Sequence, residues 1–330
     1  MVKNRIAYID RAKGIAILLL LLSHTIAFDC HLKSWITSFD MPIFFIICGI
    51  LTSLNEKKEM TNKHTLVYEI ITIKRIKQLF IPYYFFSFIL AIFFFILDYA
   101  SRGNFRIIDN LVSIIKFDGL CSLWFLPCYF FSETILKSII AIKNNLSFKI
   151  LLSIGIPLSC LIVIIYLLNV NLFYKILISE VFCLSGYFIS HLNIIEKIKK
   201  WQALLGFSFL SFTGCMNGYV GIGGLQLGNQ LLFFMNGIFL SLFLIAILYS
   251  HENLRIWKRF EYWGIYSIIV LCTNNLYIEI IRLIDYKFTG NLLLNSNYLG
   301  ILLFTIILII IEKNTIKVAK EKLMFLFGKK

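Results

Sequence analysis

Long apolar runs separated by short polar segments recur from one end of the chain to the other. Two of the clearest, residues 79–97 and 231–248, approach or reach the ~18–20 apolar residues that a helix needs to cross a bilayer. The apolar positions are continuous, whereas the strands of a membrane barrel alternate in polarity, and a helix also satisfies its own backbone amides in lipid. The pattern therefore predicts an all-α, polytopic integral membrane protein.

We expect about ten transmembrane helices in a single integral membrane domain over residues 1–330, with no appended soluble domain. No internal repeat, coiled-coil pattern or Pro-rich linker divides the chain. The expected spans lie at 14–29, 36–54, 79–97, 122–140, 150–168, 174–191, 202–217, 231–249, 263–282 and 292–311. The first span follows a basic start like that of a signal peptide, but no A-x-A cleavage site follows it, so we interpret it as uncleaved.

The composition supports a membrane protein and explains the charge. Hydrophobic residues make up 59% of the chain and charged residues 15%, against about 25% charged in soluble domains. The net charge of +14 would suit nucleic acid, but 25 of the 32 Lys and Arg fall on the N-terminal side when ten spans alternate. This asymmetry is typical of positive-inside topology and predicts that both termini are cytoplasmic. We therefore expect anionic membrane lipids as partners and no nucleic acid.

The first span holds the clearest candidate chemistry. Lys13 and His24 are eleven residues apart, which on a helix places them about 20° apart in rotation and about 16 Å apart along the axis. One face thus carries a lysine at its mouth and an imidazole deep inside. The alternative is a histidine that hydrogen-bonds a neighbouring helix, but an ionisable group within a bilayer is costly and is by default a candidate functional site.

The ordered motifs of the chain resemble the acyltransferase family 3 membrane proteins, especially the fucose 4-O-acetylase-like branch. The opening "YIDRAKGIAILLLLLSH" matches the family's Asp-x-x-Arg/Lys-Gly-Ile-Ala start with a histidine eleven residues after the basic residue. The later matches, each weak alone, are "SFDMPIFFIICGIL", "KRIKQLFIPYYFFSF", "LWFLPCYFFSE" and "YWGIYSIIVLC". The resemblance covers nearly the whole chain, and the family also has ten spans.

The resemblance implies an O-acyltransferase that moves an acetyl group from cytoplasmic acetyl-CoA to a hydroxyl of a cell-surface or lipid-linked glycan, in a bacterial inner membrane. His24 would be the catalytic residue, either as the general base or as the nucleophile that takes the acyl group. Lys13, Arg75 and Lys77 would bind the phosphates of the donor, and Asp10 would orient Lys13 or contact the adenine end. No Cys or His spacing indicates a metal site, and we expect none.

For the acceptor, we expect contacts from Asp40, Trp124, Glu133 and Asn274. An interhelical hydrogen bond is an equal alternative for Glu133. The chain departs from the family pattern at four positions. It has Lys13 where the family often has an arginine, and Gln78 where the family has the second basic residue of Arg-x-x-Arg. Asp40 and Asn274 stand where the family has histidines. The simplest interpretation is divergent specificity, and loss of activity is the alternative.

Two further features bear on the structure. Glu279 and Arg282 lie three residues apart on one helical face, which predicts a structural ion pair. The glycine-rich stretch 217–229, "NGYVGIGGLQLGN", follows no strand, so we expect a tight, uncharged outer loop near the glycan and no nucleotide site.

Rival functions are a glycan or small-metabolite transporter or export subunit without acyltransferase activity, and a non-catalytic scaffold. The absence of an internal duplication disfavours a transporter.

Overall fold

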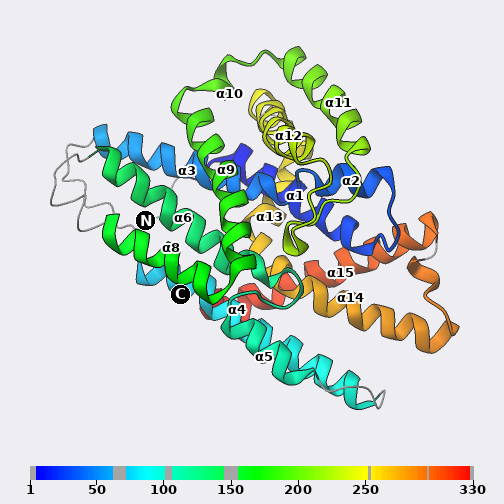
Figure 1. Cartoon of the computed structure of the whole chain (residues 1–330). Coiled ribbons are helices and arrows are strands. Elements are labelled where there is room, and N and C mark those ends of the chain that lie inside the picture. Colours follow the sequence, from blue (N-terminus) through cyan, green and yellow to red (C-terminus); the bar gives the residue numbers. More distant parts are fainter. Residues whose placement is uncertain are drawn as a thin grey trace.

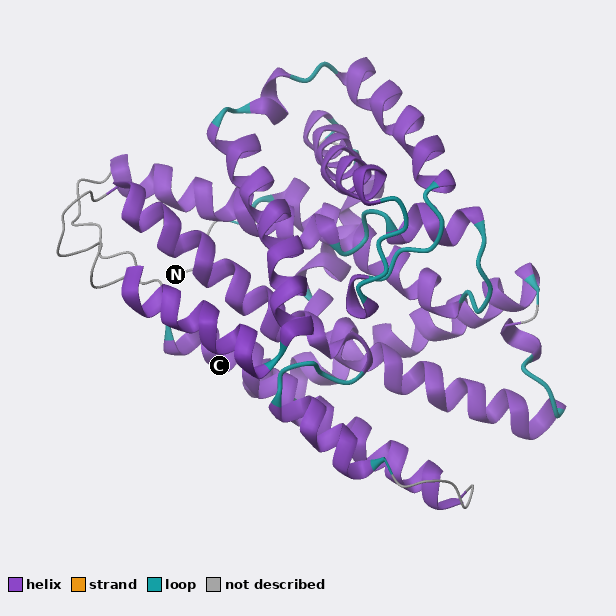
Figure 2. Cartoon of the chain, viewed as in Figure 1, coloured by secondary structure: helices purple, strands orange, loops and turns teal. Residues whose placement is uncertain are grey.

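The computed structural model describes residues 5–61, 72–100, 106–144, 155–251, 254–295 and 297–327. Within these ranges the regular structure is helical, apart from one isolated bridge between Gly221 and Gln226, as Figure 2 shows. The longer helices are α1 (Ala7–Thr25), α3 (Pro42–Thr61), α4 (Ile73–Ala100), α6 (Phe125–Asn144), α8 (Ile156–Leu168), α9 (Val170–His191), α11 (Lys200–Met216), α12 (Gln230–Ser250), α14 (Ser267–Thr289) and α15 (Tyr298–Lys322) (Figure 1).

Shorter helices connect or extend these. They are α2 (His31–Thr37), α5 (Ile107–Ile115), α10 (Ile194–Lys197) and α13 (Lys258–Ile265), with 3-10 turns η1 (Cys121–Trp124), η3 (Ile222–Gly224), η4 (Arg255–Trp257), η5 (Leu293–Asn295) and η6 (Met324–Phe327). In Figure 1, α14 and α15 form a hairpin at one edge of the molecule, and α10 and α11 arch over α12.

The prediction of an all-α polytopic membrane protein is confirmed. Each of the ten expected spans coincides with one of the longer helices. In the described part of the chain, seven segments are long and apolar enough to cross a membrane. The other three are α1, which carries three charged residues in its first turns, α8 with 13 residues, and α11 with 17. Residues 150–154, the expected start of the fifth span, lie outside the described residues.

Three expected boundaries were wrong. The expected helix 36–54 is broken, because α2 ends at Thr37 and α3 begins only at Pro42. Proline suits the first position of a helix, and it disfavours helical backbone in the residue before it. The expected span 263–282 is divided at Tyr266 between α13 and α14. The expected span 292–311 is displaced toward the C-terminus, as α15.

Glycines allow two pairs of helices to cross with their backbones in contact. A Cβ atom on Gly14 of α1 would clash with the Phe260 carbonyl of α13, and one on Gly264 would clash with the Asp10 carbonyl. Without a side chain, the two backbones can approach closely, as at other small-residue interfaces in membranes. Arg11 reinforces this crossing, because its guanidinium pairs with Glu261 at 2.6 Å while its side chain is only 3% exposed.

The α3–α9 crossing uses the same device. A Cβ atom on Gly49 would meet the Cys183 carbonyl, and one on Gly186 would meet the backbone of Ile46. Both helices are buried over most of these faces, so the crossing forms part of the hydrophobic core. These two crossings fix α1 and α3, the helices nearest to the candidate site described below.

We predict that Gly186→Ala destabilises the protein by about 1–3 kcal/mol, because the added methyl group overpacks a backbone contact. The measurement is the thermal unfolding midpoint of the detergent-solubilised protein. Gly155→Ala is the matched control, since nothing lies within 4 Å of a Cβ at Gly155. Equal midpoints for the two variants would contradict the close crossing.

Candidate functional site

The helix α1 presents Lys13 and His24 to two different cavities. The first, which we call the Lys13 cavity, has a volume of about 210 Å³ and is lined by Lys13, Arg75 and Gln78 together with Tyr129 and a set of apolar side chains. The second, the His24 cavity, measures about 270 Å³. The helix α1 runs without a break from Lys13 to His24, as the predicted shared face requires, and it carries the two residues to separate cavities.

Cations gather on the Lys13 side. The Lys13 ammonium lies 3.6 Å from a carboxylate oxygen of Asp10, one turn earlier. Lys13 also lines a third cavity of about 470 Å³ next to Asp10, Arg5 and Lys58. This part of the molecule therefore offers several positive charges around connected hollows, a suitable environment for an anionic group.

Arg75 is held in the wall of the Lys13 cavity by Glu133 and Tyr129. Its guanidinium pairs with Glu133 of α6 at 2.6 and 2.7 Å, and it lies 5.2 Å from the centre of the Tyr129 ring. Glu133 is also paired with Lys137 at 2.8 Å. Glu133 is thus placed beside Arg75 and does not line the His24 cavity, where an acceptor contact was expected. The expected interhelical hydrogen bond is confirmed.

Lys77 is placed differently from Lys13 and Arg75. Its side chain is exposed on the first turns of α4, and it lines neither the Lys13 cavity nor the His24 cavity. The structure therefore gives no contact between Lys77 and the other residues expected at the donor site.

The His24 cavity brings together residues from four parts of the chain. Asp40 comes from the turn between α2 and α3, Trp124 from η1, and Asn275 from α14. The loop after α11 supplies its roof through residues 219–224. Figure 2 shows this loop folding back toward the middle of the bundle. The expected glycine-rich loop thus lies over the histidine.

The ring of His24 is oriented by its burial. Its Nδ1 atom is buried, and in the described part of the chain it has no partner with strict hydrogen-bond geometry. The side chain of Asn274 lies near the ring, and both of its amide atoms are buried without a hydrogen-bond partner in the described part of the chain. The His24 residue itself lines the cavity. Asn274 is fully buried and does not itself line the cavity.

Asp40 lies close to His24 because the chain breaks between α2 and α3. Its Oδ1 atom accepts a hydrogen bond from the Met41 backbone N–H at 2.7 Å, and Oδ2 accepts one from Ser23 at 3.5 Å. The carboxylate is 97% buried, since Asp40 is only 3% exposed. A straight helix over 36–54 would have satisfied the Met41 amide through its own backbone.

Trp124 is anchored on both sides. Asn275 donates a hydrogen bond to Ser122, and the Ser122 hydroxyl donates one to the Leu271 carbonyl at 3.1 Å, which ties η1 to α14. Gly223 packs against the Trp124 indole, where a Cβ atom would come within 2.7 Å of Nε1. The indole therefore forms a rigid, flat wall of the His24 cavity.

Tyr219 forms another aromatic wall in the roof loop. Its ring lies under the Lys33 ammonium, 4.9 Å from the ring centre. Burial raises the pKa of the Tyr219 hydroxyl, and the negative charges of Asp29 and Asp40 raise it further. The phenol therefore stays neutral, and the cavity has two aromatic walls of the kind that stack against sugar rings.

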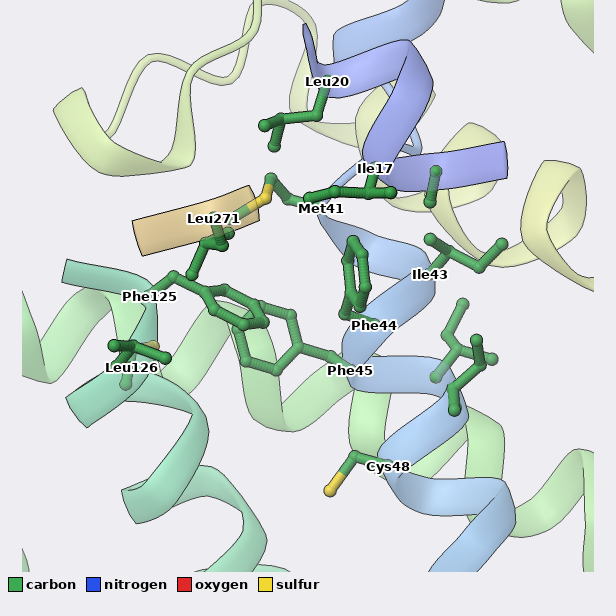
Figure 3. Close-up of a cluster of buried hydrophobic side chains, with 14 of the residues drawn as sticks. Ile17, Leu20, Met41, Ile43, Phe44, Phe45, Cys48, Phe125, Leu126 and Leu271 are labelled. Atoms are coloured by element: carbon green, nitrogen blue, oxygen red, sulfur yellow. The ribbon is translucent and has the colours of Figure 1, made fainter. Parts of the chain in front are cut away.

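Five apolar side chains separate the Lys13 cavity from the His24 cavity. Leu20 and Met41 line the His24 cavity, whereas Phe44, Phe125 and Leu271 line the Lys13 cavity. Figure 3 draws the five in one cluster, and the rings of Phe44 and Phe125 pack edge-on with their centres 5.7 Å apart. We call this set the apolar partition. Any reaction between groups in the two cavities has to cross it.

Sequence reasoning missed Lys33 and Asn275 as cavity residues. Lys33 had been counted only as a basic residue outside the membrane, and Asn275 follows the asparagine that was singled out. Two adjacent asparagines in an apolar span are unusual, and this pattern could have indicated Asn275 as a cavity residue. The expected ion pair between Glu279 and Arg282 is confirmed at 2.8 Å. Among the described residues, no group of three or more His, Cys, Asp or Glu is placed to hold a metal ion.

Comparison with known proteins places this geometry in a family. A family model described as an acyltransferase domain, Acyl_transf_3, matches residues 6–311. The chain belongs to the acyltransferase family 3 membrane proteins, and it is an O-acyltransferase embedded in a membrane. No curated protein and no solved structure matches the chain. The family and the enzyme class predicted from the motifs are confirmed, and the fucose 4-O-acetylase-like branch stays a prediction.

We predict that Arg75 and Glu133 are energetically coupled. In a double-mutant cycle of Arg75→Met and Glu133→Gln, the double variant should lose about 0.5–3 kcal/mol less stability than the two single variants added together. The reason is that either single change leaves a mostly buried charge without its main partner. Thermal unfolding in detergent measures the cycle. The control cycle pairs Glu133→Gln with Lys77→Met, and equal coupling in both cycles would contradict the assignment.

Proposed function

We propose that this acyltransferase moves an acetyl group from cytoplasmic acetyl-CoA to a hydroxyl of a cell-surface or lipid-linked glycan, in a bacterial inner membrane with both termini in the cytoplasm. The observation that carries the proposal is the pair of cavities on one helix, cationic at Lys13 and aromatic at His24. Positive-inside topology assigns the Lys13 side to the cytoplasm, where acetyl-CoA is available.

The Lys13 side suits the donor. Coenzyme A carries several phosphate charges, and arginine binds phosphate through two parallel hydrogen bonds. Lys13 and Arg75 line the Lys13 cavity, and Arg5 and Lys58 line the third cavity next to it. The pairing of Arg75 with Glu133 fixes its guanidinium fork in one orientation. We propose that Arg5, Lys13 and Lys58 bind the phosphates while the pantetheine arm extends past Arg75 toward His24.

The His24 side suits the acceptor. Trp124 and Tyr219 offer flat surfaces to a sugar ring, and Asn275 and Ser122 offer hydrogen bonds to hydroxyls. The cavity of about 270 Å³ lies just below the ~300–1,000 Å³ of pockets that hold drug-sized ligands. It therefore suits one sugar unit, with the remainder of the glycan outside.

The reaction proceeds by general-base catalysis at Nε2 of His24. The neutral imidazole takes the proton of the acceptor hydroxyl as its oxygen attacks the thioester carbonyl. The C–O bond forms, the C–S bond of the tetrahedral intermediate breaks, and the imidazolium returns its proton to the leaving thiolate. The products are the acetyl ester and free coenzyme A. We propose that the amide oxygen of Asn274, which lies near the ring, accepts a hydrogen bond from Nδ1–H when the substrates bind and so keeps Nε2 unprotonated.

The apolar partition has to open for the thioester to reach His24. Its members are side chains and not backbone, and Met41, with three rotatable bonds, adapts readily to a new shape. When closed, the partition keeps water away from the thioester and prevents a continuous aqueous path between the two cavities. We propose that binding of the pantetheine arm displaces it.

We predict that His24→Ala lowers acetyl transfer by about 100-fold or more, because the general base is lost. The measurement is the acetyl-ester content of the surface glycan, located by NMR, in cells with the wild-type protein, the variant or no protein. His191→Ala is the control, since that ring stacks on Tyr187 and does not line the His24 cavity.

Esters at the wild-type level with a normally inserted His24→Ala protein would contradict the catalytic role. An acetylated His24, detected by mass spectrometry after incubation with acetyl-CoA alone, would instead support the nucleophilic route.

A further inference from the structure

Lys33 places a positive charge in the His24 cavity. It lies in α2, and its side chain is only 16% exposed. Of the residues that line this cavity, Lys33 and Asp40 are the ones with formal charges, apart from the titratable ring of His24. The ammonium is near enough to His24 to act on it electrostatically. A group bound to Lys33 would therefore lie close to the reacting atoms.

The partners of Lys33 leave its charge poorly compensated. Its carboxylate partner, Asp29, lies 3.7 Å away and is 75% exposed, so water screens the attraction and the pair compensates the lysine charge only weakly. The second contact is the face of the Tyr219 ring. In the described part of the chain, Lys33 Nζ makes no hydrogen bond within the usual distance. An ammonium has three donors, so a buried one without acceptors is unfavourable.

Lys175 is a buried lysine of the same protein that has a close carboxylate partner. It too lies over an aromatic ring, 5.5 Å from the centre of Trp124, and its side chain is 5% exposed. Unlike Lys33, it forms a hydrogen-bonded ion pair with Asp118 at 2.9 Å. The chain can therefore pair a buried lysine closely, and at Lys33 it does not.

Asp40 does not supply the missing anion. Its two oxygens are directed to the Met41 amide and to Ser23, and no ion pair joins it to Lys33 in the described structure. A second cavity adjoins the space beside Lys33. Tyr219 and Asp29 line a further cavity of about 500 Å³, and Tyr219 borders the His24 cavity as well.

We propose that the acceptor is an anionic glycan whose carboxylate or phosphate replaces Asp29 as the partner of Lys33. The inference rests on the proposed function, since it names the substrate class of that site. An anion on the acceptor would form charge-assisted hydrogen bonds with the ammonium and hold the sugar ring against Tyr219. Lys33 is then a specificity-determining residue, and the chemistry at His24 is unchanged.

The test uses three probes that differ only at the sixth carbon of the sugar: methyl glucoside, methyl glucuronide and methyl glucoside 6-phosphate. Their binding to the purified full-length protein in detergent is measured by titration calorimetry, without acetyl-CoA. We expect the glucuronide or the phosphate to bind about tenfold tighter than the glucoside, or more. The probe that gains affinity identifies the anion as carboxylate or phosphate.

Two variants assign the effect to Lys33. In Lys33→Gln, the affinities for charged and neutral probes should become equal, whereas Lys33→Arg should keep the preference. Lys287→Gln, which removes an exposed charge at the end of α14, should also keep it. Because no donor is present, this readout does not depend on acetyl transfer.

Two results would overturn the proposal. One is a wild-type protein that binds neither anionic probe more tightly than the glucoside, including a protein that binds none of the three. The other is a preference that survives in a folded Lys33→Gln protein. If the anion preference holds but no acetyl transfer is found in cells, the proposed function fails and the anion site stands.

Discussion

The close crossing of α1 and α13 is the contact on which the rest of the site depends. Gly14 and Gly264 let the two backbones touch, and the ion pair between Arg11 and Glu261 fixes the crossing in rotation as well as in distance. A helix is rigid over two or three turns. Fixing the first half of α1 therefore determines where both Lys13 and His24 point.

The second constraint is that charges inside an apolar bundle need partners. Arg75 has Glu133, Lys175 has Asp118, and Asp40 has the Met41 amide. Each of these pairs reduces the free-energy cost of burying a charge, and the pairs also orient groups at the two cavities. Where a polar group lacks such a partner, as at His24 Nδ1, or is paired only with a largely exposed carboxylate, as at Lys33, it borders a space that a ligand can fill.

Much of this arrangement could be predicted from the sequence, because it depends on local patterns. Continuous apolar runs located all ten helices, and helical periodicity placed Lys13 and His24 on one face. The break before Pro42 was missed, although Asp40 and Pro42 were visible, because few polar residues interrupt the apolar stretch there. Apolarity alone does not distinguish one helix from two that meet at a turn.

The pairings between distant residues were harder to predict. Glu133 was expected near the acceptor, yet it lies beside Arg75, because the rotation of α6 relative to α4 is set by packing that one sequence does not reveal. Lys33 was assigned only to topology for the same reason. Its role depends on the roof loop over the cavity, which is brought there by contacts between residues far apart in the chain.

We propose that donor and acceptor meet across the apolar partition from opposite sides of the membrane. The most direct test is a proteoliposome with the protein in one orientation, with acetyl-CoA on the Lys13 side only and the native glycan acceptor on the other. We expect acetyl esters on the acceptor and free coenzyme A on the Lys13 side. Esters formed only when both substrates share one side would contradict it.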